Sequence, residues 1–378
     1  MSRRPDGLPS DANLPPALRT KVDTYVDQGG LLGALTHFFT VLDTDDADLA
    51  ATLASIPTNL FVTSALHDDA IDKADEWGAD RKRRLNEHVS VGDLIFTNVA
   101  ETVATAPDAV DLTPALETAR KIGTGQLAEE TFDGSNATVD DAIARIEARG
   151  SVWGELAVRI VAATGGYSDA QLEALRTIAT NSLFVLTVID DLADLPEDIE
   201  NDVTTLPLVY FDGDPDEYGS TEAVIDAVLT SDVPDRLAEL ITRRQAAIEA
   251  AAADLRVSLD LPNEALLEAG DRTLAWYCES ISSDSVGETV PVAQQRAIRE
   301  RVTGDEQTRR RYVAECLTEL PIAADADEAV AAVSDVPGEL LAETAIRFHH
   351  LGSIADGVMY TSLEDALAEL RTASARTP

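Results

Sequence analysis

Apolar residues recur at every third or fourth position along most of this chain. The period is clearest in residues 18–42 and 172–189, where it places the apolar side chains on one face of an α-helix. Strict alternation between apolar and polar residues, which is typical of a half-buried strand, does not occur. The pattern therefore predicts an all-α fold of about ten or more helices around one core.

Clusters of turn-forming residues divide this pattern into segments of helix length. They fall at 44–48, 107–108, 133–136, 165–166 and 212–216. Ser168 and Gln171 have the spacing of a capping box, which predicts that a helix begins there. We interpret residues 1–378 as one all-helical domain, in which the acidic stretch 211–220 is a loop that leads to the C-terminal helices.

Two aspartate-rich pentads stand at the ends of apolar runs. The first is Asp-Asp-Ala-Ile-Asp at 68–72, and the second is Asp-Asp-Leu-Ala-Asp at 190–194. In each pentad the first and last carboxylates share one helix face, where like charges repel unless a cation lies between them. Mg²⁺ binds a few carboxylates, keeps water and takes phosphate oxygens as further ligands. The pentads therefore predict a diphosphate held through Mg²⁺ between two helices.

The composition is strongly acidic. The formal net charge is -40, and lysine occurs only at positions 21, 73, 82 and 121. Such a charge opposes compaction unless salt screens it, so we expect the cytoplasm of a salt-adapted organism. It also disfavours binding to nucleic acid or to an anionic membrane surface. Acid pairs elsewhere, such as Asp45-Asp46 and Asp140-Asp141, carry little meaning in so acidic a chain.

Nothing in the sequence predicts secretion or a membrane anchor. Cys278 and Cys316 form no disulfide or metal pattern, and residues 1–16 lack the apolar core of a signal peptide. We expect no apolar run to reach the ~18 residues of a transmembrane helix. These features predict a soluble protein without a transmembrane segment.

Four segments resemble the trans-isoprenyl diphosphate synthases, the polyprenyl synthetase family. They are SALHDDAIDKAD at 64–75, VSVGDLIFTNVAE at 89–101, GQLAE at 125–129 and LTVIDDLADLPEDIENDVTTLPLVYF at 186–211. The resemblance is strongest over residues 28–211. It implies a helical bundle with a deep central apolar pocket, in which the two pentads face each other and bind an allylic prenyl diphosphate through Mg²⁺.

The resemblance also implies roles for single residues. The expected metal ligands, which would also be the catalytic residues, are Asp68, Asp69, Asp72, Asp190, Asp191 and Asp194. Gln126 and Glu129 would orient a ligand or the diphosphate. Thr63 and Ser64 would form the floor of the pocket, and because both are small we expect substrates of geranylgeranyl length or longer.

The chain departs from the family pattern mainly by lacking Lys and Arg residues. At the place of a GGKR-type motif the chain has Gly29 and Gly30 followed by Leu31-Leu32, without Lys or Arg. Three arginines after the first pentad are candidate replacements that would bind substrate: Arg81, Arg83 and Arg84. A diphosphate without surrounding cations binds poorly, so use of a second diphosphate substrate is in question.

Several functions remain open on these residues. Prenyl transfer is our first expectation, and the alternative is a terpene synthase that cyclises a single prenyl diphosphate, with Arg311-Tyr312 as a candidate diphosphate contact. A non-catalytic partner subunit of a heteromeric prenyl synthase would also explain the missing cations. A metal phosphohydrolase with His37 and His67 would leave the second pentad unexplained. The family resemblance also implies a homodimer.

Overall fold

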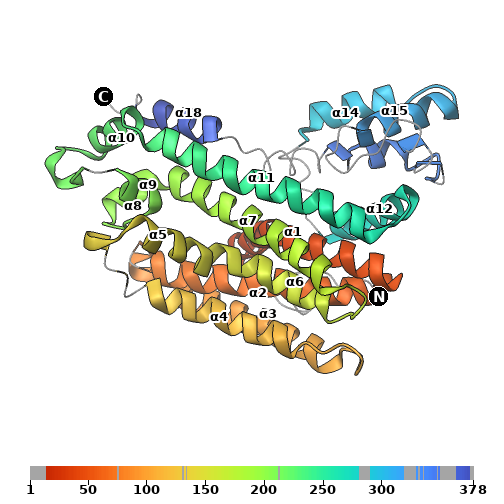
Figure 1. Cartoon of the computed structure of the whole chain (residues 1–378), viewed down its shortest axis with the longest axis horizontal. Helices are drawn as coiled ribbons and strands as arrows, with labels where there is room; N and C mark the ends of the chain where they lie inside the picture. The colour runs from red at the N-terminus through yellow and green to blue at the C-terminus, as the bar shows by residue number, and fades with distance from the viewer. Residues whose placement is uncertain are drawn as a thin grey trace. The chain divides into compact units, whose positions relative to one another are not determined.

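The all-α prediction is confirmed by the structure, a computed structural model. It describes residues 14–74, 76–129, 132, 134–211, 213–280, 290–318, 329–330, 333–334, 336–346, 348–349 and 363–374. Helices account for most of these residues, and no strand occurs among them (Figure 1). The predicted breaks near 44–48, 107–108 and 165–166 are confirmed as connections between helices.

The chain divides into two compact units. The first comprises Met1–Leu112, Ile160–Tyr167 and Leu261–Ala355, and the second comprises Thr113–Arg159, Ser168–Asp260 and Asp356–Pro378. Each pentad lies within a different unit. The interpretation of residues 1–378 as a single domain stays a prediction.

The first unit is built mainly on three long helices. Its helical segments are α1 (Pro16–Thr44), α2 (Ala47–Asp72), η1 (Gly78–Asp80), α3 (Arg81–Thr105), α12 (Asn263–Ser280), α14 (Val292–Arg301) and α15 (Glu306–Thr318). α2 packs against α1 and α3, and α1 also packs against α12. Asp46 begins α2 as its N-cap, because its carboxylate accepts a hydrogen bond from the Leu49 backbone N–H at 2.9 Å.

Glycines let α1 approach its neighbours closely. A Cβ atom at Gly30 would lie 2.7 Å from the Tyr277 ring of α12, and one at Gly33 would lie 2.8 Å from the Trp276 ring. At Gly29 it would lie 2.9 Å from the Phe61 ring of α2. These glycines therefore have a packing function inside one continuous helix.

The second unit is organised around α7 and α11. Its helical segments are α4 (Thr113–Glu129), η2 (Gly134–Asn136), α5 (Val139–Ile146), the π-helical turn η3 (Glu147–Ser151), α6 (Val152–Ala162, which continues into the first unit), α7 (Asp169–Ala193), α8 (Leu195–Glu200), α9 (Leu206–Tyr210), η4 (Pro215–Glu217), α10 (Thr221–Thr230), α11 (Val233–Leu259) and α18 (Leu363–Ser374). α7 and α11 pack side by side (Figure 1). The predicted capping box of Ser168 and Gln171 is confirmed at the start of α7.

A polar cross-link ties α11 to α7 and to η3. The Arg244 guanidinium lies 4.0 Å from the centre of the Phe184 ring and donates hydrogen bonds to Asn181 at 2.9 Å and to Glu147 at 2.8 Å. Behind it lies an apolar cluster that includes Phe184, Val188 and Leu192 of α7. This packing fixes the helix that carries the second pentad.

Two helices correct the expectation that no segment is apolar enough to cross a membrane. By length and composition alone, Ala47–Asp72 and Asp169–Ala193 would suffice. In the structure, 61% and 39% of their apolar windows are buried against the protein. Core helices of soluble proteins pass the same test, so two such helices are weak evidence for a membrane protein.

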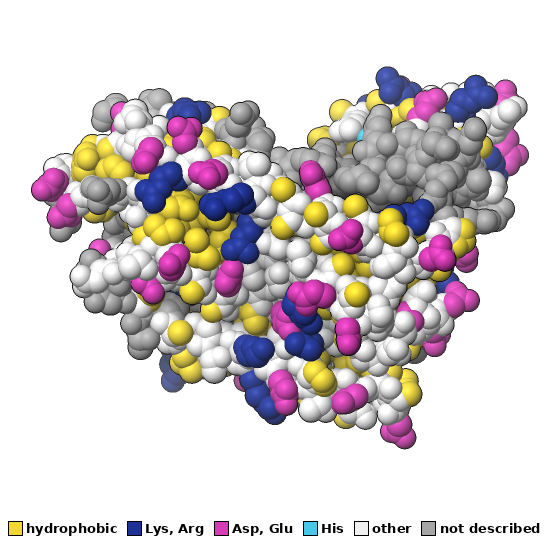
Figure 2. Space-filling model, viewed as in Figure 1, with side chains coloured by type: hydrophobic (Ala, Val, Ile, Leu, Met, Phe, Trp, Pro, Cys, Tyr) yellow, Lys and Arg dark blue, Asp and Glu magenta, His cyan; other side chains and the backbone are white. Residues whose placement is uncertain are grey.

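Acidic and basic side chains lie close together on the surface. Figure 2 shows Lys and Arg side chains next to Asp and Glu side chains on one face. Glu155 illustrates this arrangement, because it pairs with both Arg159 at 2.7 Å and Arg176 at 2.8 Å. Such pairs reduce the local repulsion between carboxylates.

Candidate active site

The first pentad forms the C-terminal end of α2 in the first unit. Asp72 is the last residue of the helix and is exposed, Asp68 is half-buried, and Asp69 is only 5% exposed. The Asp69 carboxylate accepts hydrogen bonds from Lys21 and Tyr25 of α1 at Oδ2, and Lys73 Nζ lies 2.8 Å from its Oδ1. Asp69 is therefore surrounded by donors from the protein itself.

These donors stabilise the charged form of Asp69. Burial alone would raise the pKa of this carboxyl, but the hydrogen bonds from Lys21, Lys73 and Tyr25 outweigh it and hold the pKa below its usual value. Burial and the bond to Asp69 raise the pKa of the Tyr25 hydroxyl, which stays protonated. His88 Nε2 is buried 4.0 Å from Asp69 Oδ2, while its Nδ1 lies 2.8 Å from the Arg84 carbonyl oxygen.

The predicted substrate-binding arginines begin α3. Arg81, Arg83 and Arg84 are all exposed. The Arg83 guanidinium forms ion pairs with Glu87 at 2.9 Å and with Asp80 at 3.3 Å. A role for this run in binding diphosphate stays a prediction.

The predicted pocket floor lies on the face of α2 that meets α3. Thr63 is buried, and its hydroxyl donates a hydrogen bond to the Gly92 carbonyl oxygen at 3.3 Å. Ser64 is half-buried. The deep pocket and the length of the prenyl substrate that it would accept stay predictions.

The histidines of the phosphohydrolase alternative have separate partners. His37 Nδ1 lies 2.9 Å from the Thr273 hydroxyl, and its ring stacks on Trp276 at 4.9 Å. His67 Nε2 instead lies 3.5 Å from an Asp93 carboxylate oxygen. These contacts give the alternative no support.

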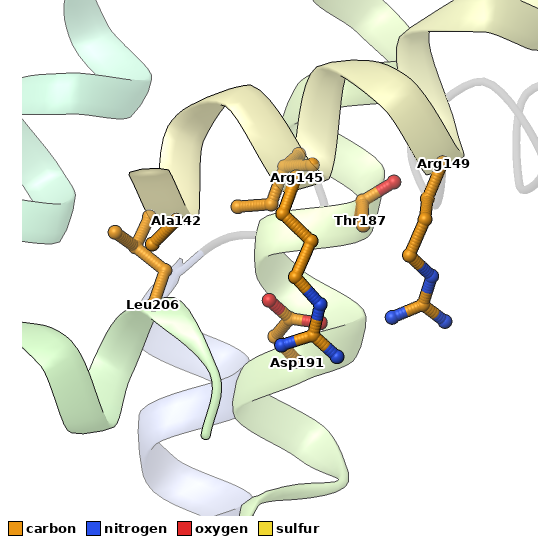
Figure 3. A pocket seen from close by; sticks show the side chains of 7 residues that line it. Ala142, Arg145, Arg149, Thr187, Asp191 and Leu206 are labelled. Atoms are coloured by element: carbon orange, nitrogen blue, oxygen red, sulfur yellow. The ribbon is translucent and has the colours of Figure 1, made fainter. Parts of the chain in front are cut away.

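The second pentad forms the end of α7 in the second unit. Asp190 and Asp194 are exposed, Asp191 is half-buried, and Asp194 ends α7 immediately before α8. A cavity of about 10 Å³, roughly the space of one water molecule, lies beside Asp191. Its lining consists of Ala142, Arg145, Ile146, Arg149, Thr187, Asp191 and Leu206, and Figure 3 shows the Arg145 and Asp191 side chains pointing toward each other.

Small residues bring two more segments to this place. A Cβ atom at Gly150 would collide with the Thr187 side chain, so only glycine lets η3 lie so close to α7. A Cβ atom at Gly125 would lie 2.6 Å from the Ala148 carbonyl oxygen, which brings α4 against η3 in the same way. Arg149 and Gln126, each next to one of these glycines, are positioned by this packing.

In the second pentad the surroundings disfavour the charged form of the carboxylates Asp190 and Asp191, in contrast to Asp69. Burial raises the pKa of Asp191 to about 7; Arg149 and Arg145 oppose the shift, and Asp198 and Asp190 add to it. Burial also raises the pKa of Asp198 to about 6. Burial raises the pKa of Asp190 as well, but this residue is exposed, so water screens its charge better than that of the half-buried Asp191.

The remaining predicted residues lie on α4. Gln126 is half-buried, and Glu129 is the last residue of the helix, with a side chain outside the described part of the structure. Their predicted roles stay predictions. Arg145, from α5, also donates a hydrogen bond to the Thr204 carbonyl oxygen.

The residues around the two pentads fit Mg²⁺ to different degrees. Among the described residues, no three Asp, Glu, His or Cys side chains lie close enough together to hold a metal ion by themselves. Mg²⁺ commonly uses one or two carboxylates and completes its shell with water and substrate phosphates. The partly desolvated carboxylates at the end of α7 fit such a site, whereas both oxygens of Asp69 already accept hydrogen bonds.

Sequence reasoning missed the cations beside both pentads. Lys73 follows Asp69 by four residues, so helical spacing could have indicated this pair. Arg145 and Arg149 lie beside Asp191 only through tertiary packing, for which the sequence gives no local signal. No local signal connects Lys21 and Tyr25 with a carboxylate more than 40 positions away.

Comparison with solved structures gives clear likenesses. The heptaprenyl diphosphate synthase from Staphylococcus aureus has a TM-score of 0.55 and 14% identity, covering 72% of this chain and 94% of its own. The polyprenyl synthase from Caulobacter crescentus CB15 complexed with calcium and isoprenyl diphosphate has a TM-score of 0.52 and 20% identity, over 73% and 92%. The geranylgeranyl pyrophosphate synthetase from the archaeon Geoglobus acetivorans has a TM-score of 0.50 and 15% identity, over 72% and 92%.

The likeness establishes the fold. No family profile and no curated protein sequence matches the chain. All three structures are trans-prenyl diphosphate synthases, and at such low identity they show that this chain has the same all-α isoprenoid synthase fold. The resemblance to the polyprenyl synthetases is thus confirmed at the level of fold.

Proposed function

We propose that this chain is a Mg²⁺-dependent isoprenoid synthase that removes diphosphate from an allylic prenyl diphosphate and transfers the prenyl cation. The observation that carries the proposal is the end of α7, where Asp191 is held partly desolvated beside Arg145 and Arg149 on a prenyl synthase fold. A bound cation would offset the free-energy cost of keeping the partly buried Asp191 carboxylate charged. The guanidinium groups can bind phosphate oxygens.

The aspartates would bind Mg²⁺, and the arginines would bind the diphosphate. Asp68, Asp72, Asp190, Asp191 and Asp194 would hold Mg²⁺, which when bound would neutralise charge on the departing diphosphate. Arg145 and Arg149, and on the resemblance also Gln126 and Glu129, would orient the diphosphate.

A prenyl diphosphate is the substrate class that the comparison supports. The Caulobacter crescentus structure contains isoprenyl diphosphate and calcium, as its name states. Because its fold matches that of this chain, we carry over the substrate class only. A deep apolar pocket floored by Thr63 and Ser64 would protect the prenyl cation from water.

A second candidate is cyclisation of a single prenyl diphosphate. The glycines at the place of the GGKR-type motif, Gly29 and Gly30, lie inside α1 and pack against Phe61 and Tyr277. Their positions supply no cation, and the backbone N–H groups of a helix interior are already hydrogen-bonded. This observation favours an enzyme that uses one diphosphate substrate.

The cellular setting belongs to the same proposal. The net charge of -40 fits a cytoplasm rich in salt, where screening is strong. A homodimer or a heteromeric prenyl synthase is the assembly that the resemblance implies.

One experiment distinguishes the candidates. The purified protein is incubated in high salt and Mg²⁺ with geranylgeranyl diphosphate, with and without isopentenyl diphosphate, and extracts are analysed for longer diphosphates and for hydrocarbons. A longer diphosphate that requires both substrates establishes prenyl transfer. A hydrocarbon or alcohol from the allylic substrate alone establishes a terpene synthase.

Controls make a negative result informative. Asp190→Asn should reduce the formation of either product by about 10³-fold, whereas Asp140→Asn, which alters an exposed aspartate in the first turn of α5, should leave it unchanged. If the unaltered protein also forms no product from shorter and longer allylic substrates, the enzyme proposal is overturned. That result would favour a non-catalytic partner subunit.

A further inference from the structure

Two of the four lysines in the whole chain meet at one carboxylate of the first pentad. Lys21 approaches from α1 and Lys73 from the residue after α2, and both bind Asp69. Lysines placed at random in so acidic a chain would rarely share a partner. The arrangement therefore points to a specific task for Asp69.

Both oxygens of Asp69 are engaged by protein donors. Oδ2 accepts hydrogen bonds from Lys21 and from the Tyr25 hydroxyl, and Oδ1 lies 2.8 Å from Lys73 Nζ. Asp69 is 5% exposed, while Lys21 and Lys73 are 29% and 46% exposed. A metal ion at Asp69 would have to share a buried oxygen with an ammonium group or displace that group, and both are costly because the positive charges repel or the ion pair is broken.

We propose that Asp69 is a positioning residue and not a metal ligand: it clamps α1 to the end of α2 and thereby sets the orientation of Asp68 and Asp72. This inference rests on the proposed function, in which those two carboxylates bind Mg²⁺. The clamp consists of Asp69 with Lys21, Tyr25 and Lys73.

The position of the clamp explains how it would act. Lys21 and Tyr25 lie one turn apart on α1, so they grip the same carboxylate from one helix face. Asp68 precedes Asp69 in the same turn of α2, and Asp72 lies in the next and last turn. Holding Asp69 therefore holds the frayable end of the helix that carries both.

The test uses the full-length protein with Mg²⁺ and inorganic diphosphate as the probe. Melting temperature is measured without Mg²⁺, and the apparent Mg²⁺ affinity is measured from the Mg²⁺-dependent shift under conditions in which every variant is folded. The variants are Asp69→Asn, Lys21→Met, Asp68→Asn and, as a matched lysine control, Lys121→Met. Lys121 is exposed on α4.

A clamp gives a distinctive pattern. Asp69→Asn should lower the melting temperature without Mg²⁺ by about 5 °C or more, because it leaves two ammonium groups without their partner. It should also weaken Mg²⁺ binding by about 10-fold, as expected for a residue that orients ligands. Asp68→Asn should lower the metal-free melting temperature less than Asp69→Asn does, because Asp68 is only half-buried, and it should lose the Mg²⁺ response.

Lys21→Met separates positioning from simple electrostatics. Removing a positive charge near the pentad would by itself strengthen the binding of a cation. If Asp69 positions the ligands, Lys21→Met should instead weaken Mg²⁺ binding in the same direction as Asp69→Asn. Lys121→Met should change neither quantity.

Two results would overturn the proposal. A metal-free melting temperature of Asp69→Asn equal to that of the unaltered protein, with a lost Mg²⁺ response, would make Asp69 a ligand. Destabilisation with an unchanged Mg²⁺ affinity would make its role purely structural. If Asp68→Asn keeps the full Mg²⁺ response, the proposed metal-binding function fails instead, and the metal-free melting temperatures still report on the clamp.

Discussion

The two pentads have nearly the same sequence but opposite electrostatic surroundings. Around the first, Lys21, Lys73 and Tyr25 hold the pKa of Asp69 below its usual value although the carboxylate is buried. Around the second, burial raises the pKa of Asp191 to about 7 in spite of Arg145 and Arg149. At Asp69 the protein's own donors outweigh the effect of burial on the pKa, whereas at Asp191 burial outweighs the effect of the two arginines.

The difference shows that a repeated motif does not imply repeated roles. A carboxylate that is already neutralised contributes stability to the fold, whereas a desolvated carboxylate with incomplete compensation favours the binding of an added cation. We infer that the second pentad provides the stronger attraction for Mg²⁺. In the first pentad this role is left to Asp68 and Asp72.

The strongest challenge to the comparison is removal of a metal-binding carboxylate from each pentad. Asp190→Asn and Asp68→Asn should each reduce turnover by about 10³-fold, because metal-ion catalysis contributes several kcal/mol to the stabilisation of the leaving group. The measurement is product formation from geranylgeranyl diphosphate at saturating Mg²⁺. The matched control is Asp140→Asn, for which wild-type turnover is expected.

A reduction in only one of the two variants would break the idea that both pentads serve the reaction. Unchanged turnover in both would exclude the aspartates from the chemistry altogether.

The pH dependence of stability in the first unit contains a contribution from His37 as well as one from Asp69. Burial, aided by Arg272, lowers the pKa of His37 to about 4 from an unfolded value near 6.5, and the side chain is 1% exposed. Between these pH values the unfolded chain binds a proton at His37 that the folded chain does not bind. The free energy of unfolding therefore decreases as the pH falls from about 6.5 to about 4. The loss is on the order of 3 kcal/mol.

Equilibrium unfolding by denaturant at several pH values measures this slope. His37→Phe should flatten it between pH 4 and 6.5. The contribution of Asp69, whose pKa is lowered, is present above about pH 4 and disappears only below it. An unchanged slope in His37→Phe would assign the effect to another group.

Arg149 sharpens the comparison on the side of the second pentad. Arg149→Met should raise the KM for the prenyl diphosphate and lower kcat/KM by about 10- to 100-fold, because one charge-assisted hydrogen bond contributes about 1.5–3 kcal/mol. Steady-state kinetics measure the change. Arg120→Met, at an exposed position on α4, serves as the control and should match the unaltered protein.

Salt should affect the surface more than the clamp. Raising KCl from about 0.1 M to 2 M shortens the Debye length to a few Å and should raise the melting temperature by a few degrees, because the net charge is -40. The difference between Asp69→Asn and the unaltered protein should persist at 2 M KCl, since buried pairs are screened weakly. Its disappearance at high salt would place the ion pairs at the surface.

Much of the fold was predictable from the sequence because it depends on local signals. Apolar periodicity predicted the helices, and turn residues predicted the breaks after α1, α3 and α6. The capping box of Ser168 predicted the start of α7 to the residue. The two compact units follow from tertiary contacts, for which a single sequence gives no comparable signal.

The site was predictable only in part. The pentads indicated which carboxylates to consider, but not that α1 places Lys21 and Tyr25 on one of them. The glycines of α1 suggested a lost diphosphate motif, and the structure adds that they permit close helix packing. The roles of Gln126 and Glu129 rest on the resemblance alone.

The most direct measurement compares Asp69→Asn with Asp191→Asn in the absence of Mg²⁺. Both replace a carboxylate by its neutral isostere, so the two variants differ only in what surrounds that carboxylate. We predict melting temperatures that move in opposite directions at pH 7.5 and above: lower for Asp69→Asn, which loses its ion pairs, and higher for Asp191→Asn, which loses a desolvated charge. Shifts of the same sign in both variants would contradict the distinction between the two pentads.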